Sequence, residues 1–152
     1  MERGKGEYKD YFNIQILVDP RLSLEEQLKL RGIESHISLG SVINLTEIPE
    51  EPYKVFARIL RADATHPSGY SVEEALQEFA KDEVGSPLIE VVALWLLYPE
   101  LFLNLGVLAP GSIYDEQFVP SVDIFSGKPE IHAYRIDFKN RNWGVLSRRK
   151  RI

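Results

Sequence analysis

Residues 86–112, SPLIEVVALWLLYPELFLNLGVLAPGS, form the most apolar stretch of the chain and carry only two charges, both glutamates. Only eight uncharged residues separate Glu90 from Pro99. A membrane-spanning helix needs about 20 consecutive apolar residues, so this stretch does not span a membrane. Residues 88–98 are apolar on nearly all sides, which is typical of a helix buried between layers. We therefore expect a core helix here.

The ends of this core helix are indicated by serine and proline. Ser86 predicts the N-cap, and Pro87 predicts the first helical position, where a missing N–H costs nothing. Pro99 would break a continuous helix but suits the first turn of a second one. We expect that second, short helix to end at Gly106.

Two further helices are predicted from capping boxes, in which a serine hydroxyl and a glutamate carboxylate each satisfy a free backbone N–H. The first begins after Ser23 and runs to about Leu30. The second begins after Ser71, has an apolar stripe at helical spacing, and is expected to end at Gly85.

Strands are predicted where apolar and polar residues alternate. The turn sequence SGKP at 126–129 joins two of these segments and predicts a β-hairpin. The predicted strands lie at 12–18, 53–60, 117–125, 130–138 and 143–147. Together the elements indicate one α+β domain over residues 1–152, with an antiparallel sheet packed against a layer of two to four helices. We expect residues 1–10 to be a polar lead-in and 148–152 to be a basic tail.

Composition excludes several classes of function. The 152 residues include no cysteine, which rules out disulfides, thiolate metal sites and cysteine nucleophiles. The beginning of the chain has no apolar stretch of signal-peptide length, and we expect a cytoplasmic protein. The net charge is −5 but uneven, because residues 1–138 carry −11 and the remainder carries six basic residues without an acid.

The C-terminal half also carries a recognisable series of motifs: SVEEAL, YPELF, VLAPGSIY, FVPSVDIFSG, EIHAYRIDF and NWGVLSRRK. Over roughly residues 69–150 this series resembles a group of small uncharacterised bacterial proteins common in candidate phyla. Those relatives usually have Ala-Leu-Gly-Ser where this chain has Ala109-Pro110-Gly111-Ser112. The resemblance supports the single domain and implies no reaction, cofactor or partner.

One arrangement of residues is typical of a metal-dependent nuclease. Asp123 on one strand, followed by Asp137 and Lys139 in a carboxylate-x-Lys pattern, matches restriction-enzyme-like nucleases, and Glu90 could complete the set. In such a site the acids hold a divalent metal and the lysine assists the attacking water. The alternative interpretation is that Arg135, Asp137 and Lys139 form the solvated face of an edge strand.

No other motif predicts a metal or cofactor. The three histidines, His36, His66 and His132, lack the i, i+4 spacing that places two imidazoles on one ion. His132 shares an apolar strand face with Tyr134, so we expect a buried core histidine. The glycines form no phosphate-binding loop, and no serine has the context of a hydrolase nucleophile. The sequence thus predicts no metal and no cofactor.

The basic terminus is the remaining candidate binding element. Arg148, Arg149, Lys150 and Arg151 could contact nucleic-acid phosphates, or they could be a solvated tail. Because no set of acid, base and electrophile stands out, we expect a soluble, non-catalytic binding or interaction module, with the nuclease as the alternative. Its protein partner or ligand is not identified by the sequence, and membrane association is not expected.

Overall fold

The expected core helix is present as α4 (Leu88–Leu97) in the computed structural model, which describes residues 12–152. The polar lead-in at 1–10 lies outside the described residues. Every residue from Leu88 to Leu94 is buried, whereas Trp95 and Leu96 are partly buried. Helix α4 packs on strands β1 (Ile14–Val18) and β8 (Phe118–Phe125). It is therefore the centre of the larger hydrophobic cluster, as predicted.

The start of α4 differs from the prediction in one respect. Pro87 rather than Ser86 occupies the N-cap position and provides no side-chain cap. The backbone N–H of Leu88 instead donates to the hydroxyl of Ser112, 2.9 Å away. A serine distant in sequence thus satisfies a donor that a local cap usually satisfies.

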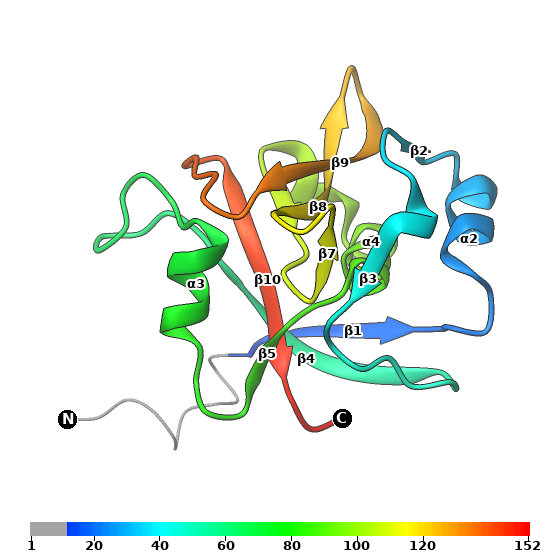
Figure 1. The fold of residues 1–152 in the computed structure, drawn as a ribbon, viewed down its shortest axis with the longest axis horizontal. Helices are drawn as coiled ribbons and strands as arrows, with labels where there is room; N and C mark the ends of the chain where they lie inside the picture. Colours follow the sequence, from blue (N-terminus) through cyan, green and yellow to red (C-terminus); the bar gives the residue numbers. More distant parts are fainter. Residues whose placement is uncertain (1–11) are drawn as a thin grey trace.

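The strands form one curled, mixed sheet of ten strands (Figure 1). Its main path runs β1, β4 (Tyr53–Leu60), β10 (Trp143–Arg149), β6 (Gly106–Leu108), β8, β7 (Ser112–Tyr114) and β3 (Val42–Asn44). Off this path, β9 (Lys128–Arg135) pairs with β8 and with β2 (Glu34–Ser35), and β5 (Glu83–Gly85) pairs with β10.

The expected antiparallel sheet is thus only partly correct. Two pairings, β10 with β6 and β2 with β9, are parallel, and the others are antiparallel. Strand alternation reveals neither partner nor direction, because the same pattern suits both kinds of ladder. The α+β class holds, with three α-helices.

The two capped helices begin where the capping boxes predict. Helix α2 (Leu24–Arg31) has Ser23 as its N-cap, and α3 (Val72–Glu78) has a complete capping box with Ser71. Helix α3 ends at Phe79 instead of Gly85, because residues 83–85 form β5 and pair with β10. The segment after Pro99 is a 3-10 helix, η3 (Pro99–Leu103), and a second one, η2 (Leu39–Ser41), precedes β3.

A second hydrophobic cluster lies beneath α3. Val72 and Ala75 of the helix pack with Leu108, Val119 and Val145 of the sheet. Tyr134, Phe138 and Trp143 border this cluster with partly buried rings. The sheet therefore has apolar residues on both faces.

The predicted hairpin joins β8 to β9. Ser126 and Gly127 form its two-residue turn, with φ angles of 51° and 79°. Two positive φ values fit a type I′ turn, whose twist matches that of the flanking strands. The turn fixes the register that pairs Asp123 with Glu130 and Ser121 with His132. None of the helices within residues 12–152 has the length and apolar content needed to cross a bilayer.

Candidate metal centre

Strands β2 and β9 bring two histidines and a glutamate onto one face of the sheet. Glu130 and His132 alternate on β9 and so point to the same side. The parallel register places Glu34 beside Glu130, and His36 follows two residues later beside His132. The backbone N–H of His36 donates to the carbonyl of Ile131, 2.9 Å away, which extends this pairing beyond β2. We call His36, Glu130 and His132 the two-histidine cluster.

The donor atoms of the two-histidine cluster converge on one carboxylate oxygen. The Nε2 atom of His132 lies 2.9 Å from Glu130 Oε1, and that of His36 lies 3.2 Å from the same atom. One ligand atom from each of the three residues lies within 4.8 Å of the others. The imidazole rings are stacked, with centroids 4.4 Å apart and an angle of 8° between their planes.

The cluster is accessible but not fully solvated. The side chain of His36 is 41% exposed, whereas those of His132 and Glu130 are 25% and 19% exposed. The hydrogen bond with His132 lowers the pKa of Glu130, so that this carboxylate is ionised at neutral pH. Phe125 packs against the outer side of the His132 ring at 5.0 Å. In this arrangement the Nε2 atoms of both histidines face Glu130.

This set of donors is suited to divalent transition metals. Imidazole nitrogens and a carboxylate oxygen bind Zn²⁺ at about 2.0–2.2 Å, which places the donors about 3–4 Å from one another. Two histidines and one carboxylate are the ligands of many catalytic zinc sites and of non-haem iron(II) sites. Three protein ligands leave coordination positions open for another ligand.

Asp123 lies beside the cluster and differs from Glu83 and Glu90, the other two acidic residues that are buried in the described chain. Asp123 is 7% exposed, and its Oδ1 atom is buried without a hydrogen-bond partner among the described residues. Burial raises the pKa of Asp123 to about 6, and the charges of His132 and His36 oppose that rise. Asp123 also lines a pocket, together with Trp143 and Gly106.

Sequence reasoning missed the cluster because its members are far apart along the chain. His36 and His132 are 96 residues apart, and only the parallel pairing of β2 with β9 brings them together. The expectation of a satisfied core histidine at 132 is only partly correct, since the ring is hydrogen-bonded to Glu130 but a quarter exposed. The available signal was Glu-x-His at 130–132, which puts a carboxylate and an imidazole on one strand face.

The four residues of the nuclease hypothesis have different surroundings. Glu90 is buried against Arg148 and Tyr53, whereas Asp123 has no hydrogen-bond partner at Oδ1. Asp137 lies exposed beside Arg135, with 3.3 Å between the paired atoms. Lys139 is ion-paired with Glu74. Nothing in these contacts favours the nuclease, which stays a prediction.

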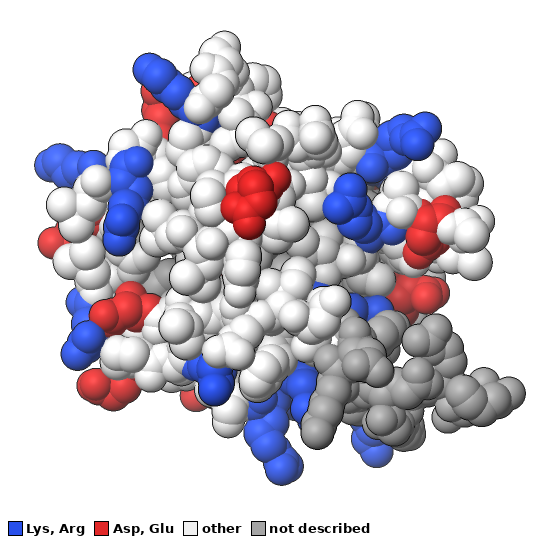
Figure 2. Space-filling view, turned by 180° about the vertical axis from the view of Figure 1, so that it is seen from behind, with Lys and Arg blue, Asp and Glu red and all other residues white. Residues whose placement is uncertain are grey.

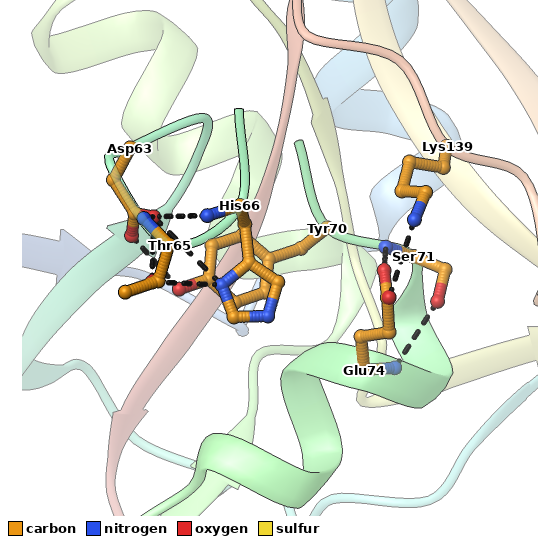
Figure 3. Close-up of polar contacts among 7 residues, drawn as sticks. All are labelled: Asp63, Thr65, His66, Tyr70, Ser71, Glu74 and Lys139. Carbon is orange, nitrogen blue, oxygen red and sulfur yellow. Dashed lines mark hydrogen bonds and ion pairs between the residues drawn. The ribbon is translucent and has the colours of Figure 1, made fainter. Parts of the chain in front are cut away.

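The lysine of that hypothesis belongs to the α3 cap. In Figure 3, the Nζ atom of Lys139 points to Glu74 of the capping box, with 3.2 Å between the paired atoms. Arg135, Asp137 and Lys139 are all exposed, as the alternative interpretation expects, but only Arg135 lies in β9, so the three do not form one face of an edge strand.

The third histidine, His66, lies in the loop that precedes α3 and is not part of the two-histidine cluster. Asp63 accepts hydrogen bonds from the backbone N–H of His66 at 2.7 Å and from the hydroxyl of Tyr70 at 2.9 Å (Figure 3). These bonds, that from Tyr70 above all, lower the pKa of Asp63 to about 2. The His66 ring stacks on Tyr70 with a centroid distance of 4.0 Å. These contacts order the loop that leads into α3.

The basic terminus is in part a strand. Arg148 is 2% exposed in β10, and its Nε atom donates to Glu90, so the expectation of a solvated tail from residue 148 is wrong for Arg148. Arg149 lies near Asp82, with 3.5 Å between the paired atoms. Lys150 and Arg151 are exposed. Seen from behind, Lys and Arg side chains occupy several separate places around the edge of the molecule, without forming a single basic patch on that face (Figure 2).

No known protein family matches this chain, and neither a curated protein nor a solved structure is detectably similar to it. The resemblance over residues 69–150 therefore stays a prediction. The two-histidine cluster and the adjoining pocket are therefore the features of the molecule that indicate a function.

Proposed function

We propose that the protein is a binding module whose ligand is a divalent transition-metal ion held by His36, Glu130 and His132. The observation that supports this most directly is that two imidazole Nε2 atoms approach one carboxylate oxygen, at 2.9 and 3.2 Å. In the metal-bound state, an ion replaces the protons shared between these groups. The exposed edge of His36 gives the ion a path from solvent.

The proposed ion keeps open coordination positions. Within the described residues three side chains converge, whereas structural zinc sites are closed by four protein ligands. Glu34 Oε1 lies 3.2 Å from His36 Nε2, the same atom that would bind the ion, so this exposed carboxylate is adjacent to the proposed ion. The bound ion could thus take a ligand or partner group from solvent, which agrees with a binding module.

Titration with Zn²⁺ followed by calorimetry tests the proposal. We expect saturable binding of one Zn²⁺ per chain, weakened at least about tenfold by His132→Ala or His36→Ala, because loss of a ligand costs at least as much as loss of its supporting partner. Co²⁺ offers a second readout, since its visible spectrum reports the number of ligands.

His66→Ala is the matched control, because His66 lies in the Asp63 loop and belongs to no cluster of donors. It should bind Zn²⁺ as the wild type does. The proposal fails if the wild type shows no saturable binding, or if His66→Ala and His132→Ala weaken binding equally.

A further inference from the structure

A second candidate site adjoins the two-histidine cluster without sharing its donor atoms. It is a pocket of about 300 Å³ where η3, β6, β8 and the start of β10 meet. Its lining is Phe102, Leu103, Asn104, Leu105, Gly106, Asp123, Ile124, Asn142 and Trp143. Pockets that bind small molecules begin at about this volume and combine apolar walls with a few polar groups.

The only ionisable group that lines the pocket is Asp123, and the described chain gives its Oδ1 atom no donor. A buried carboxylate without a hydrogen bond or counter-charge is costly, and proteins retain few such groups. Within residues 12–152, no lysine or arginine lines the pocket. The imidazoles whose charges act on Asp123 are paired with Glu130.

Trp143 forms an aromatic wall that the fold holds in place. A Cβ atom at position 106 would lie 2.5 Å from the Trp143 ring, so the ring occupies space that only a glycine leaves free. Tyr134 and Phe138 contact the same ring edge-on, with centroids 4.7 and 5.4 Å away. The sheet register places Gly106 next to Trp143 on β10, and beside the strand that carries Asp123.

We propose that this pocket binds a small organic cation, a primary ammonium or guanidinium group on a compact apolar body. Asp123 Oδ1 would accept a charge-assisted hydrogen bond from the cation, which is a donor that the described residues do not supply. Trp143 presents the aromatic side chain that attracts cations most strongly. The apolar wall from Phe102, Leu105 and Ile124 would contact the body of the ligand, and Asn104 and Asn142 would select among its polar groups.

The intrinsic fluorescence of Trp143 tests this proposal directly. The chain has two tryptophans, so a Trp95→Phe background leaves Trp143 as the only one. Benzylamine is the probe, and benzyl alcohol is its neutral isostere. All titrations contain EDTA, so that an amine cannot act through a bound metal ion.

We expect benzylamine to change the Trp143 emission saturably, and benzyl alcohol to bind at least about tenfold more weakly, because hydrogen bonds to charged groups exceed neutral ones by about this factor. Asp123→Asn keeps the shape of the side chain and should weaken benzylamine about tenfold or more. Asp137→Asn is the matched control, since Asp137 is an exposed aspartate that does not line the pocket. It should leave benzylamine binding unchanged.

The comparison of the two probes needs no variant of Asp123, so the test stands even if Asp123→Asn does not fold. Equal affinity for benzylamine and benzyl alcohol, or no saturable response to either, overturns the proposal. Binding of benzylamine in EDTA, where no metal ion is bound, separates this site from the metal site. A response that disappears in His132→Ala but persists in Asp123→Asn contradicts the assignment to Asp123.

Discussion

Two carboxylates, Glu90 and Asp123, lie in the interior of this protein in opposite circumstances. The Glu90 carboxylate accepts a hydrogen bond from Arg148 Nε at 2.9 Å and another from the Tyr53 hydroxyl at 2.9 Å. Asp123 Oδ1 is buried without any hydrogen-bond partner in the described chain. Glu90 comes from the core helix and is enclosed by the fold, whereas Asp123 lines a pocket.

The difference separates a structural role from a binding role. Burial raises the pKa of Glu90, but Arg148 and Tyr53 oppose that rise and give the ionised form its partners. Burial, together with the charge of Glu130, raises the pKa of Asp123 to about 6, and the charges of His132 and His36 oppose that rise. A satisfied buried charge fixes the fold, whereas an unsatisfied one is retained at a cost, which is typical of a functional site.

The largest expected effect is the loss of the partner of Glu90. Arg148→Ala leaves the carboxylate buried and unpaired, and it should lower the free energy of unfolding by about 3–5 kcal/mol. Denaturant unfolding at neutral pH measures it. Arg151→Ala, an exposed change in the same basic run, should cost less than about 0.5 kcal/mol. Similar losses in the two variants would show that Arg148 behaves as part of a tail.

Asp123→Asn should raise the free energy of unfolding instead of lowering it. The folded pKa of about 6 exceeds the ordinary value of 3.8, so the folded state binds more protons than the unfolded state between these values. The wild type therefore loses stability as pH rises through this window. We expect Asp123→Asn to be more stable than the wild type by about 1–2 kcal/mol at pH 7, after allowing for partial solvation.

This gain should shrink as pH falls and vanish below about pH 4, where the aspartate is protonated in both states. Unfolding curves in EDTA at pH 4 and pH 7 measure it. A loss of stability at pH 7 would mean that Asp123 has a stabilising partner in solution, and a gain that does not depend on pH would mean that the gain does not arise from the charge of Asp123.

A loss of about the same size as the gain in Asp123→Asn concerns the hydroxyl of Tyr53. Tyr53→Phe removes one hydrogen bond to Glu90 while Arg148 stays in place, so the free energy of unfolding should fall by about 1–2 kcal/mol. Tyr114→Phe, on the short strand β7, is the control. If Tyr53→Phe and Tyr114→Phe are equally stable, the Glu90 group is held by Arg148 alone.

Features that depend on neighbouring residues could be predicted from the sequence. The apolar run at 88–97 predicted the core helix, the Ser71 and Glu74 spacing predicted the capping box, and the turn at 126–129 predicted the hairpin. Each depends on contacts within a few positions along the chain, where side-chain periodicity and turn chemistry decide the conformation.

Features that depend on strand pairing were decided only by the tertiary structure. Parallel pairing of β2 with β9 places His36 beside His132, and pairing of β10 with β4, β5 and β6 buries Arg148 against Glu90. The sequence suggested a tail at Arg148 because four consecutive cations are usually solvated. A buried charge becomes stable only where a distant residue supplies its partner, and the position of that partner is set by strand order and register.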